Sequence, residues 1–482
     1  MLAPNLRRPF ILGAIMISSF MIAIEATIVS TAMPQIVASL GNLNLYAWVF
    51  SAFLLAQTAT TVVFGKLSDL YGRKPIVMIG IAVFLIGSLL CGFATSMPAL
   101  IGFRLIQGFG AGAVQPVTLT MVGDLYPGHE RGKVQGWLAS VWGISAVVGP
   151  LAGGLIIQHL SWAWIFWINL PIGIAAAAGF LVFLHEKVEH EDRNVDVAGA
   201  SLFAIAIASL MVALTDIGAS ASLVVPALGV FVIASGLFVL QERRARDPMV
   251  AFGLWAHRPI ATANIVGLLS AMAVIGLTTF LPMYVQAVMN RSALVAGFTL
   301  TVMVLGWPIA ATLAARNFHR LGLRPTLVLG SLLLPLGAIP FLFLRTDLSP
   351  LLAGLGSMIM GFGMGLLSTA GIVIIQGSVG WAERGSATAS NLFSRNLGST
   401  LGATLLGAVL NLSLGQSGRS VASDRIRGLI EHRVSGSGDD SVRLALAHGL
   451  HLTFWGVFLI ALATLLVSFL VPSVALGGAD HE

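Results

Sequence analysis

Long apolar runs, separated by short polar segments, make up most of the chain. A helix of about 20 apolar residues spans the roughly 30 Å hydrocarbon core of a bilayer, and fourteen runs are close to that length. They lie at residues 9–32, 45–65, 76–96, 98–121, 134–157, 163–184, 197–215, 223–240, 260–284, 295–315, 326–344, 350–375, 388–411 and 451–472. The pattern predicts an all-α polytopic membrane protein with fourteen transmembrane helices.

The basic residues alternate between the two sides of this predicted layout. Most of the 26 Lys and Arg residues fall in segments that would be cytoplasmic if the N-terminus lies inside, and few fall in the short outer loops. Short cytoplasmic loops of membrane proteins collect such residues. The distribution predicts that both termini are cytoplasmic. No small-residue cleavage site follows the first run, so that helix is expected to remain as an anchor.

The composition excludes several classes of protein. Of the 482 residues, 57% are hydrophobic and 10% are charged, which is unlike any soluble domain of this size. No basic patch with interleaved aromatic residues indicates a nucleic-acid partner, and anionic lipid headgroups are the expected partners of the basic residues. Cys91 is the only cysteine, which rules out a disulfide framework or a cysteine metal site. We expect neither a metal nor a cofactor.

Glu25 is the one carboxylate deep inside a long apolar run. An ionised carboxylate in hydrocarbon costs several kcal/mol, so such a residue usually faces a hydrated cavity and marks a substrate or proton path. Because burial disfavours the charged form, Glu25 is a candidate for reversible protonation near neutral pH. The alternative is a structural Glu whose carboxylate is satisfied by a neighbouring helix.

Arg104 lies in the fourth predicted helix, in the sequence LIGFRLIQGFGAGAV of residues 100–114. An Arg in a membrane helix must be paired or hydrated. Arg104 could pair with Glu25 and release it when the two separate, or it could bind backbone carbonyl groups as a fixed structural residue.

The segment GKLSDLYGRKP, residues 65–75, forms a tight turn between the second and third predicted helices. A solvated cytoplasmic loop that obeys the positive-inside rule would explain the bases of this segment, but not its acid or its glycines. The segment resembles the loop motif of the major facilitator superfamily. By that resemblance a conformational lock is expected at Gly65, Asp69, Gly72, Arg73 and Lys74, and Arg104 with Gln107 and Gly108 resembles the family's proton-transfer motif.

The fifth predicted helix contains GISAVVGPLAGG, residues 143–154. The segment resembles the antiporter motif of the superfamily at Gly149, Pro150, Gly153 and Gly154, with Ser145 in place of the usual glycine. Generic close packing of small residues is the alternative explanation. SWAWIFWINLPIG at 161–173 and the first helix are similar to the fourteen-helix drug/proton antiporters of the EmrB/QacA type, although Ala163 replaces an Arg and Glu25 an Asp of that pattern.

The resemblance implies a six plus two plus six arrangement of helices. Residues 1–184 would form the N-terminal six-helix half, residues 185–258 charged connectors and a two-helix insert, and residues 259–482 the C-terminal half. A long outer loop is expected at 412–450, with an amphipathic stretch, VASDRIRGLIEHR, inside it. Segments 315–325 and 383–410 resemble family patterns in the second half.

These expectations describe a proton-coupled multidrug efflux transporter, not an enzyme, that works by alternating access in a bacterial inner membrane. Its substrates would be lipophilic, preferably cationic compounds, the proton gradient would supply the energy, and a monomer is expected. A mostly apolar cavity could include Met21, Phe53, Gln57, Trp142, Phe280, Tyr284 and Trp307, because aromatic and Met side chains adapt to varied ligands. The alternatives are an exporter of an endogenous lipid or metabolite, a proton/solute symporter and an intramembrane enzyme.

Overall fold

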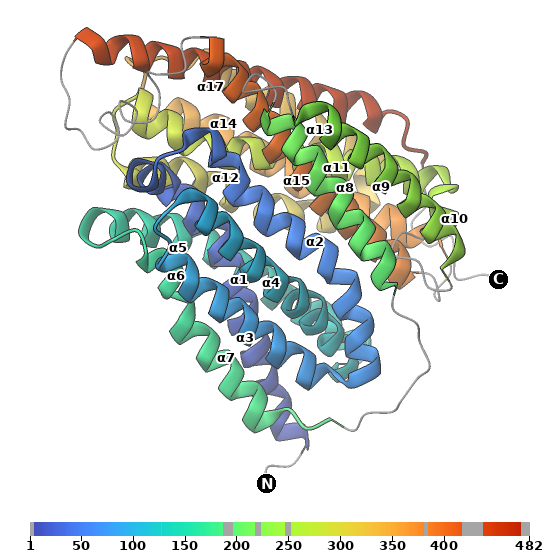
Figure 1. Ribbon diagram of the computed structural model, residues 1–482. Coiled ribbons are helices and arrows are strands. Elements are labelled where there is room, and N and C mark those ends of the chain that lie inside the picture. The colour runs from blue at the N-terminus through green and yellow to red at the C-terminus, as the bar shows by residue number, and fades with distance from the viewer. Residues whose placement is uncertain are drawn as a thin grey trace. The chain divides into compact units, whose positions relative to one another are not determined.

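The computed structural model consists of helices throughout its described part, which comprises residues 4–126, 128–186, 196–216, 223–245, 252–379, 384–416 and 437–473. Twelve helices in these residues are long and apolar enough to cross a membrane. Figure 1 shows the helices in chain order. A helix satisfies its backbone hydrogen bonds within one segment, as the hydrocarbon core requires. With twelve such apolar helices in its described residues, the protein is a multi-pass membrane protein.

The expectation of fourteen transmembrane helices is wrong for the described residues, which contain twelve candidate spans. The predicted runs 45–65 and 197–215 form helices α2 (Tyr46–Tyr71) and α8 (Val197–Asp216), but neither is among the twelve. The apolar part of α8, Ser201–Leu214, spans only about 21 Å at the helical rise of about 1.5 Å per residue. Helix α2 has polar residues at its middle, Gln57 and Thr58, and no stretch of its described residues qualifies.

The chain divides into two compact units, of which the first consists of Met1–Ala32, Trp48–Val212 and Val225–Met249. Its helices begin with most of α1 (Pro4–Leu40) and α2, followed by α3 (Arg73–Gly92), α4 (Met97–Leu125), α5 (Gly128–His159), α6 (Trp164–Trp167) and α7 (Asn169–Phe183). Ser96 caps α4 by accepting a hydrogen bond from the backbone N–H of Ala99. A buried apolar cluster that includes Ile15, Ile81 and Phe180 joins α1, α3, α4 and α7.

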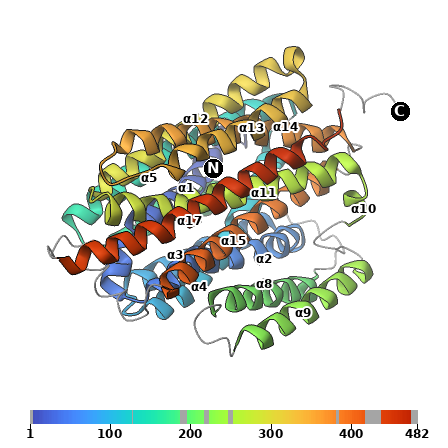
Figure 2. The ribbon, with the colours of Figure 1, turned by 90° about the horizontal axis from the view of Figure 1, so that it is seen from above.

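Most residues of helices α8 and α9 (Val224–Arg244) belong to unit 1, and the two helices lie side by side (Figures 1 and 2). Their faces meet through Phe203 and Phe238, whose ring centroids lie 5.8 Å apart. Asp196 caps α8 by accepting from the N–H of Gly199, and it also accepts from Gln241 of α9. The predicted two-helix insert therefore forms a helix pair fastened by side-chain contacts.

The second unit consists of Met33–Ala47, Ala213–Val224 and Val250–Glu482. Its helices are α10 (Phe252–Trp255), α11 (Arg258–Met283), the π-helical turn η2 (Tyr284–Val288), α12 (Ala293–Leu321), α13 (Leu323–Leu342), α14 (Pro350–Gly377), α15 (Arg384–Gln416) and α17 (Ser437–Ser468), together with η1 (Leu43–Leu45). Helix α14 packs between α12 and α13, and α11 packs against α15 and α17. The serines Ser292 and Ser349 cap α12 and α14.

Both ends of the predicted outer loop 412–450 are helical in the structure. Helix α15 continues to Gln416 and α17 begins at Ser437, because the apolar periodicity extends beyond the runs that hydropathy selects. The amphipathic stretch at 421–433 lies outside the described residues. The domain boundaries at 184 and 258 stay predictions.

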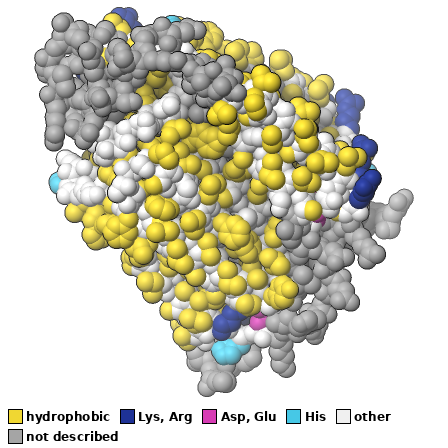
Figure 3. All heavy atoms as spheres, in the orientation of Figure 1, with side chains coloured by type: hydrophobic (Ala, Val, Ile, Leu, Met, Phe, Trp, Pro, Cys, Tyr) yellow, Lys and Arg dark blue, Asp and Glu magenta, His cyan; other side chains and the backbone are white. Residues whose placement is uncertain are grey.

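The described surface has the distribution expected for a protein in lipid. On the face seen in Figure 3, apolar side chains cover most of the described surface, and Lys and Arg side chains gather at its margins. Large apolar residues such as Val225, Val232 and Leu466 are more than half exposed. Such wide apolar exposure would be unfavourable in water and is favourable against acyl chains.

Candidate functional site

Glu25 and Arg104 form a buried ion pair in unit 1. Glu25 lies on α1 and Arg104 on α4, and their exposed fractions are 0% and 2%. The guanidinium Nη1 of Arg104 donates to Glu25 Oε1 and, at 2.6 Å, to Gln107 Oε1. Arg104 Nε donates to the backbone carbonyl of Val49 at 3.1 Å. Both alternatives drawn from the sequence are therefore present together: Arg104 pairs with the acid and also binds a backbone carbonyl.

Two further polar side chains complete this group, which we call the polar network and define as Glu25, Ser88, Arg104, Gln107 and Asn169. Asn169, the first residue of α7, donates to Glu25 Oε2 at 2.6 Å. Gln107 donates to Ser88 Oγ on α3 at 2.7 Å. Four helices thus contribute to one carboxylate and its partners, and all five residues are at most 2% exposed.

The surroundings of the polar network are apolar and aromatic. The Cζ atom of Arg104 lies 4.2 Å from the ring centroid of Phe53 and 6.0 Å from that of Phe166. Met21, Phe53 and Phe84 form a buried cluster next to it. In such an environment a single unpaired charge costs several kcal/mol, so the acid and the Arg each require the other. Any proton that Glu25 gains or loses changes this balance directly.

Asn169 has an unused acceptor beside the acid. Its Oδ1 atom is buried and makes no hydrogen bond. A rotation of the amide by half a turn would present Oδ1 to Glu25 at the cost of the Nδ2 contacts to Glu25 and, at 3.5 Å, to Ser88. Asn169 can therefore serve either protonation state of Glu25, donating to the carboxylate or accepting from the protonated acid.

The small residues of α5 bring that helix against α1 just beyond Glu25. A Cβ atom at Gly149 would lie 2.0 Å from Thr27 Oγ1, and one at Gly153 would lie 3.1 Å from Ile28. Thr27 also donates to the carbonyl of Ser145 at 3.3 Å. The segment predicted to be an antiporter motif thus packs closely against α1, the helix that bears Glu25. Gly154 is also buried on α5.

The turn between α2 and α3 is held against the end of α7. Gly72 has φ of 93°, in the left-handed region that favours glycine, and allows the reversal. Arg73 Nε lies 3.8 Å from Glu186 Oε1, and the backbone N–H of Lys74 donates to the other carboxylate oxygen. Lys74 Nζ donates to the carbonyl groups of Leu181, in the last turn of α7, and of Leu184, the residue after the helix, where the helix dipole favours a cation.

Two members of the predicted lock make no described contact of this kind. The side chain of Asp69 lies outside the described residues, and nothing lies within 4 Å of a Cβ built at Gly65. The role of the lock stays a prediction.

The predicted cavity residues of unit 1 have different environments. Met21 and Phe53 are buried next to the polar network, at 0% and 4% exposed. Gln57 donates to Gln115 on α4 at 3.0 Å. Trp142 on α5 is 43% exposed. Met21 and Phe53 therefore adjoin the polar network, and Trp142 has an accessible ring.

The predicted cavity residues of unit 2 include two that are fully packed. Phe280 stacks on Tyr46, with ring centroids 5.7 Å apart, and Tyr284 donates to the carbonyl of Leu344 at 2.8 Å. Trp307 on α12 is partly exposed, and its ring contacts the guanidinium of Arg395. Contact of these residues with a substrate stays a prediction.

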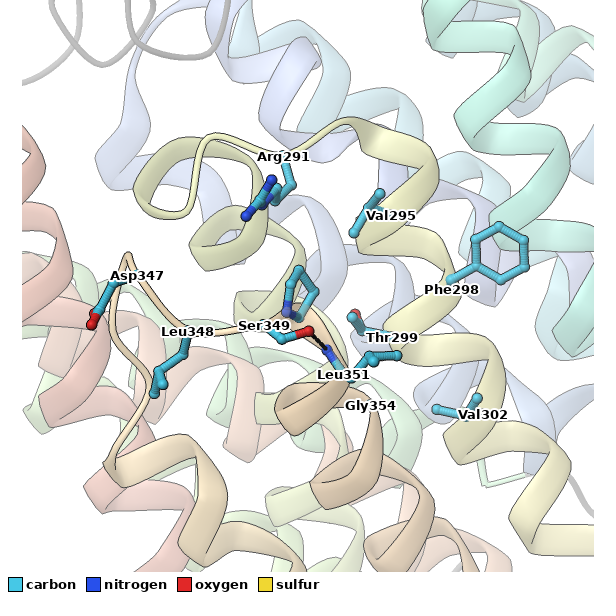
Figure 4. Close-up of a pocket in the computed structure, with 11 residues that line it drawn as sticks. Arg291, Val295, Phe298, Thr299, Val302, Asp347, Leu348, Ser349, Leu351 and Gly354 are labelled. Carbon is cyan, nitrogen blue, oxygen red and sulfur yellow. Dashed lines mark hydrogen bonds between the residues drawn. The ribbon is translucent and has the colours of Figure 1, made fainter.

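An open cavity of about 740 Å³ lies in unit 2 beside the starts of α12 and α14 (Figure 4). Its walls include Phe298, Thr299 and Leu351, and Arg291 and Asp347 come from the segments that precede the two helices. None of the seven predicted cavity residues lines it.

Four residues of these contacts were given no role from the sequence: Ser88, Asn169, Glu186 and Arg395. Asn169 follows a run of tryptophans that indicated only a membrane interface, and Glu186 stood in a charged connector. Arg395 was noted in no role, although an Arg within a long apolar run is a signal in itself. The polar residues Ser88 and Asn169 could have been found by the same criterion, as hydrogen-bonding side chains within apolar helices.

Comparison with known proteins agrees with this architecture. The chain matches the Major Facilitator Superfamily over residues 15–403. It is 36% identical over 408 residues to "Multidrug resistance protein 3" of Bacillus subtilis (83% of this chain, 79% of the relative) and 33% identical over 413 residues to "Multidrug transporter protein MdtP" of the same organism (85% and 76%).

Solved structures show the same fold. A bacterial homolog of the human lysosomal transporter Spinster, in an inward-facing and unoccupied conformation, aligns with a TM-score of 0.72 at 15% identity, covering 96% of this chain and 97% of that one. A D-xylose-proton symporter aligns with a TM-score of 0.65 at 12% identity, covering 96% and 98%.

The chain belongs to the Major Facilitator Superfamily, and the two Bacillus subtilis relatives are named as a multidrug resistance protein and a multidrug transporter. The expectation that it is not an enzyme is confirmed by this membership. The narrower resemblance to the EmrB/QacA type is not confirmed, and its fourteen-helix arrangement is contradicted by the twelve candidate spans of the described residues.

Proposed function

We propose that this protein is a drug/proton antiporter that exports lipophilic compounds by alternating access. The observation that carries the proposal is the ion pair of Glu25 and Arg104, fully buried between α1 and α4. It is supported by relatives named as multidrug transporters. An intramembrane acid with a basic partner is the usual chemical basis of a proton relay in transporters.

Protonation of Glu25 changes the interactions between α1 and α4. The neutral acid no longer attracts Arg104 as an ion, while Arg104 keeps Gln107, the carbonyl of Val49 and the ring of Phe53. Asn169 can turn its free Oδ1 to the new acid proton. Since both protonation states have hydrogen-bond partners, the proton shifts the balance between two conformations rather than unfolding the site.

The contact between α1 and α5 gives this change a route to the rest of unit 1. Thr27 and Ile28 lie directly after Glu25 and pack against Gly149 and Gly153 without intervening side chains. A displacement of α1 therefore displaces α5, because backbones in such close contact cannot slide freely. This coupling is the function that we assign to the small residues of α5.

The proton gradient supplies sufficient free energy for export. One proton crossing 100 mV and one pH unit releases about 3.7 kcal/mol, from about 2.3 for the potential and about 1.4 for the pH difference. Exchange of one proton for one neutral compound could therefore sustain a concentration ratio of about 500-fold. We place the protein in the cytoplasmic membrane of a bacterium, with the basic segments facing inward, in accord with the positive-inside rule.

Transport in proteoliposomes tests the proposal. The purified protein is reconstituted into vesicles and an acid-inside pH gradient is applied. Uptake of a lipophilic compound is followed by the fluorescence of the compound, and proton movement is followed by a pH-sensitive dye inside the vesicles. Antiport predicts uptake that a protonophore abolishes, and addition of the compound without a gradient should move protons in the opposite direction. Proton movement in the same direction as the compound would identify a symporter, and gradient-independent uptake would exclude proton coupling.

A further inference from the structure

Arg395 is a membrane-embedded cation that lacks an acidic partner. It lies on α15 within the candidate span Ser390–Leu414. None of the six candidate spans of unit 2 contains Asp or Glu. Within the described part of the chain Arg395 makes no ion pair, and its Nε atom is buried without a hydrogen-bond partner. Arg104 of unit 1, by contrast, has Glu25.

The surroundings of Arg395 hold its side chain in place without neutralising it. The Cζ atom lies 5.3 Å from the ring centroid of Trp307 on α12. Gly267 on α11 makes room for the aliphatic stem, because a Cβ built there would lie 3.4 Å from Arg395 Cγ. A cation–π contact with an aromatic face orients a guanidinium but leaves its N–H groups, which lie in the guanidinium plane, available for an acceptor.

A small cavity with three polar side chains in a mostly apolar wall adjoins Arg395. It has a volume of about 10 Å³ and is lined by Arg395, Asn391 and Ser368 together with apolar residues of α11, α13 and α14. That space holds about one water-sized group. Asn391 is itself fixed, since it donates to Asn264 Oδ1 at 3.1 Å, and Asn264 donates to Ser390 Oγ at 3.1 Å. The cavity is thus preformed and has donors at its wall.

We propose that Arg395 binds the acidic group of the transported compound, so that the substrates include lipophilic organic acids. This inference rests on the function proposed above. The planar guanidinium matches a carboxylate in two parallel hydrogen bonds. The small cavity admits an oxygen of the acid group, while Trp307 and the apolar residues offer contacts to a lipophilic body.

The charge arrangement favours an anion at this position over a cation. Glu25, on which a preference for cations would rest, is neutralised by Arg104. Arg395 makes no ion pair within the described residues and its Nε atom is buried without a hydrogen-bond partner, so an arriving carboxylate would supply a counterion. A preference for cationic compounds stays a prediction, and the same experiment tests it.

Three pyrene compounds of equal length separate these possibilities: 1-pyrenebutyrate, 1-pyrenebutanol and 1-pyrenebutylammonium. Their binding to the full chain in phosphatidylcholine nanodiscs is measured by fluorescence, for wild type, Arg395→Gln, Arg395→Lys and the control Arg324→Gln. Arg324 is an exposed Arg at the start of α13 whose Nη2 donates to the carbonyl of Phe469. The control removes the same charge from the same unit.

We expect Arg395→Gln to weaken pyrenebutyrate binding by about ten- to a hundredfold, the range for a lost hydrogen-bonded charge, and to leave the alcohol within about threefold. Arg395→Lys should bind the acid with intermediate affinity, because Lys keeps the positive charge but lacks the paired N–H donors of a guanidinium. Arg324→Gln should resemble wild type. Unchanged pyrenebutyrate binding in Arg395→Gln, or equal loss of all three compounds, would overturn the proposal.

Two further measurements separate the alternatives. In nanodiscs with phosphatidylglycerol, unchanged acid binding by wild type supports a transported substrate, whereas a loss confined to wild type would assign Arg395 to lipid phosphate and refute the inference. In proteoliposomes, proton-driven transport of the alcohol without any Arg395-dependent preference for the acid would refute this inference and leave the antiporter. Arg395-dependent acid binding without proton-driven transport of any compound would refute the antiporter and leave Arg395 as a binding residue for acids.

Discussion

The substitution Glu25→Gln removes the charge of the carboxylate and keeps its shape. In the structure, Gln at this position would still accept from Arg104, which also keeps Gln107 and the carbonyl of Val49. The Asn169 amide would then face a donor, but its unpaired Oδ1 can rotate into place. Because Arg104 is left as an uncompensated buried charge, the expected loss is about 3–5 kcal/mol, and Glu25→Ala, which also removes the hydrogen-bond acceptor, should lie at the upper end of that range.

The functional effect should be much larger than this loss of stability. A residue that cannot titrate cannot carry the proton, so the concentration ratio driven by the gradient should fall from as much as about 500-fold to near one. Binding of the compound should persist, since the substitution leaves the shape of the site unchanged. Gradient-driven uptake in proteoliposomes, binding in nanodiscs and the thermal melting of the purified protein measure the three quantities separately.

The control is Asp347→Asn, which makes the same chemical change at an exposed ion pair. Asp347 lies 3.4 Å from Arg345, and both side chains are more than half exposed. Exposed pairs contribute little, so this variant should transport and melt as wild type does. Should Glu25→Gln fail to fold, the double variant with Arg104→Gln removes both charges and keeps the test possible. Full proton-driven uptake by either Glu25 variant would refute the reasoning.

Three other substitutions test the remaining contacts. Gly149→Val should cost about 1–3 kcal/mol and slow transport, because even a Cβ would lie 2.0 Å from Thr27 Oγ1, whereas Gly102→Ala, with open space around it, should be neutral in melting and transport assays. Lys74→Ala removes two hydrogen bonds to the end of α7 and should lower stability by about 1–3 kcal/mol, which unchanged thermal melting would contradict. Asp69→Asn should impair transport while expression and substrate binding remain, and normal transport would exclude Asp69 from the predicted lock.

Prediction from sequence worked where the signal is local. Each predicted apolar run contains a helix, because hydropathy and the need for internal backbone hydrogen bonds act within one segment. The number of spans was misjudged at α8, whose apolar part is too short, and at α2, where polar residues interrupt the run. The loop at 412–450 was overestimated for a related reason, since helices continue past the apolar stretch at both ends.

Prediction of the site was partial, because contacts between helices depend on how each helix is rotated and packed. Glu25 and Arg104 were singled out by their types, and the structure brings them together across 79 positions of sequence. Asn169 lies 144 positions from Glu25, and nothing in its neighbourhood in the sequence indicates that it faces the acid. Which side chains face each other depends on the rotation of several helices, and the sequence around one residue does not specify that rotation.

The sequence by itself determined that this chain is helical, that it crosses a membrane and which few charges enter the hydrocarbon region. Those properties follow from the transfer free energy of individual segments. Only the tertiary structure decided which of those charges are neutralised. Glu25 and Arg104 pair because α1 and α4 present them to each other, whereas Arg395 meets Trp307 and Gly267 instead of an acid. The physical reason is that an ion pair acts over a few ångströms, and packing alone sets distances of that size.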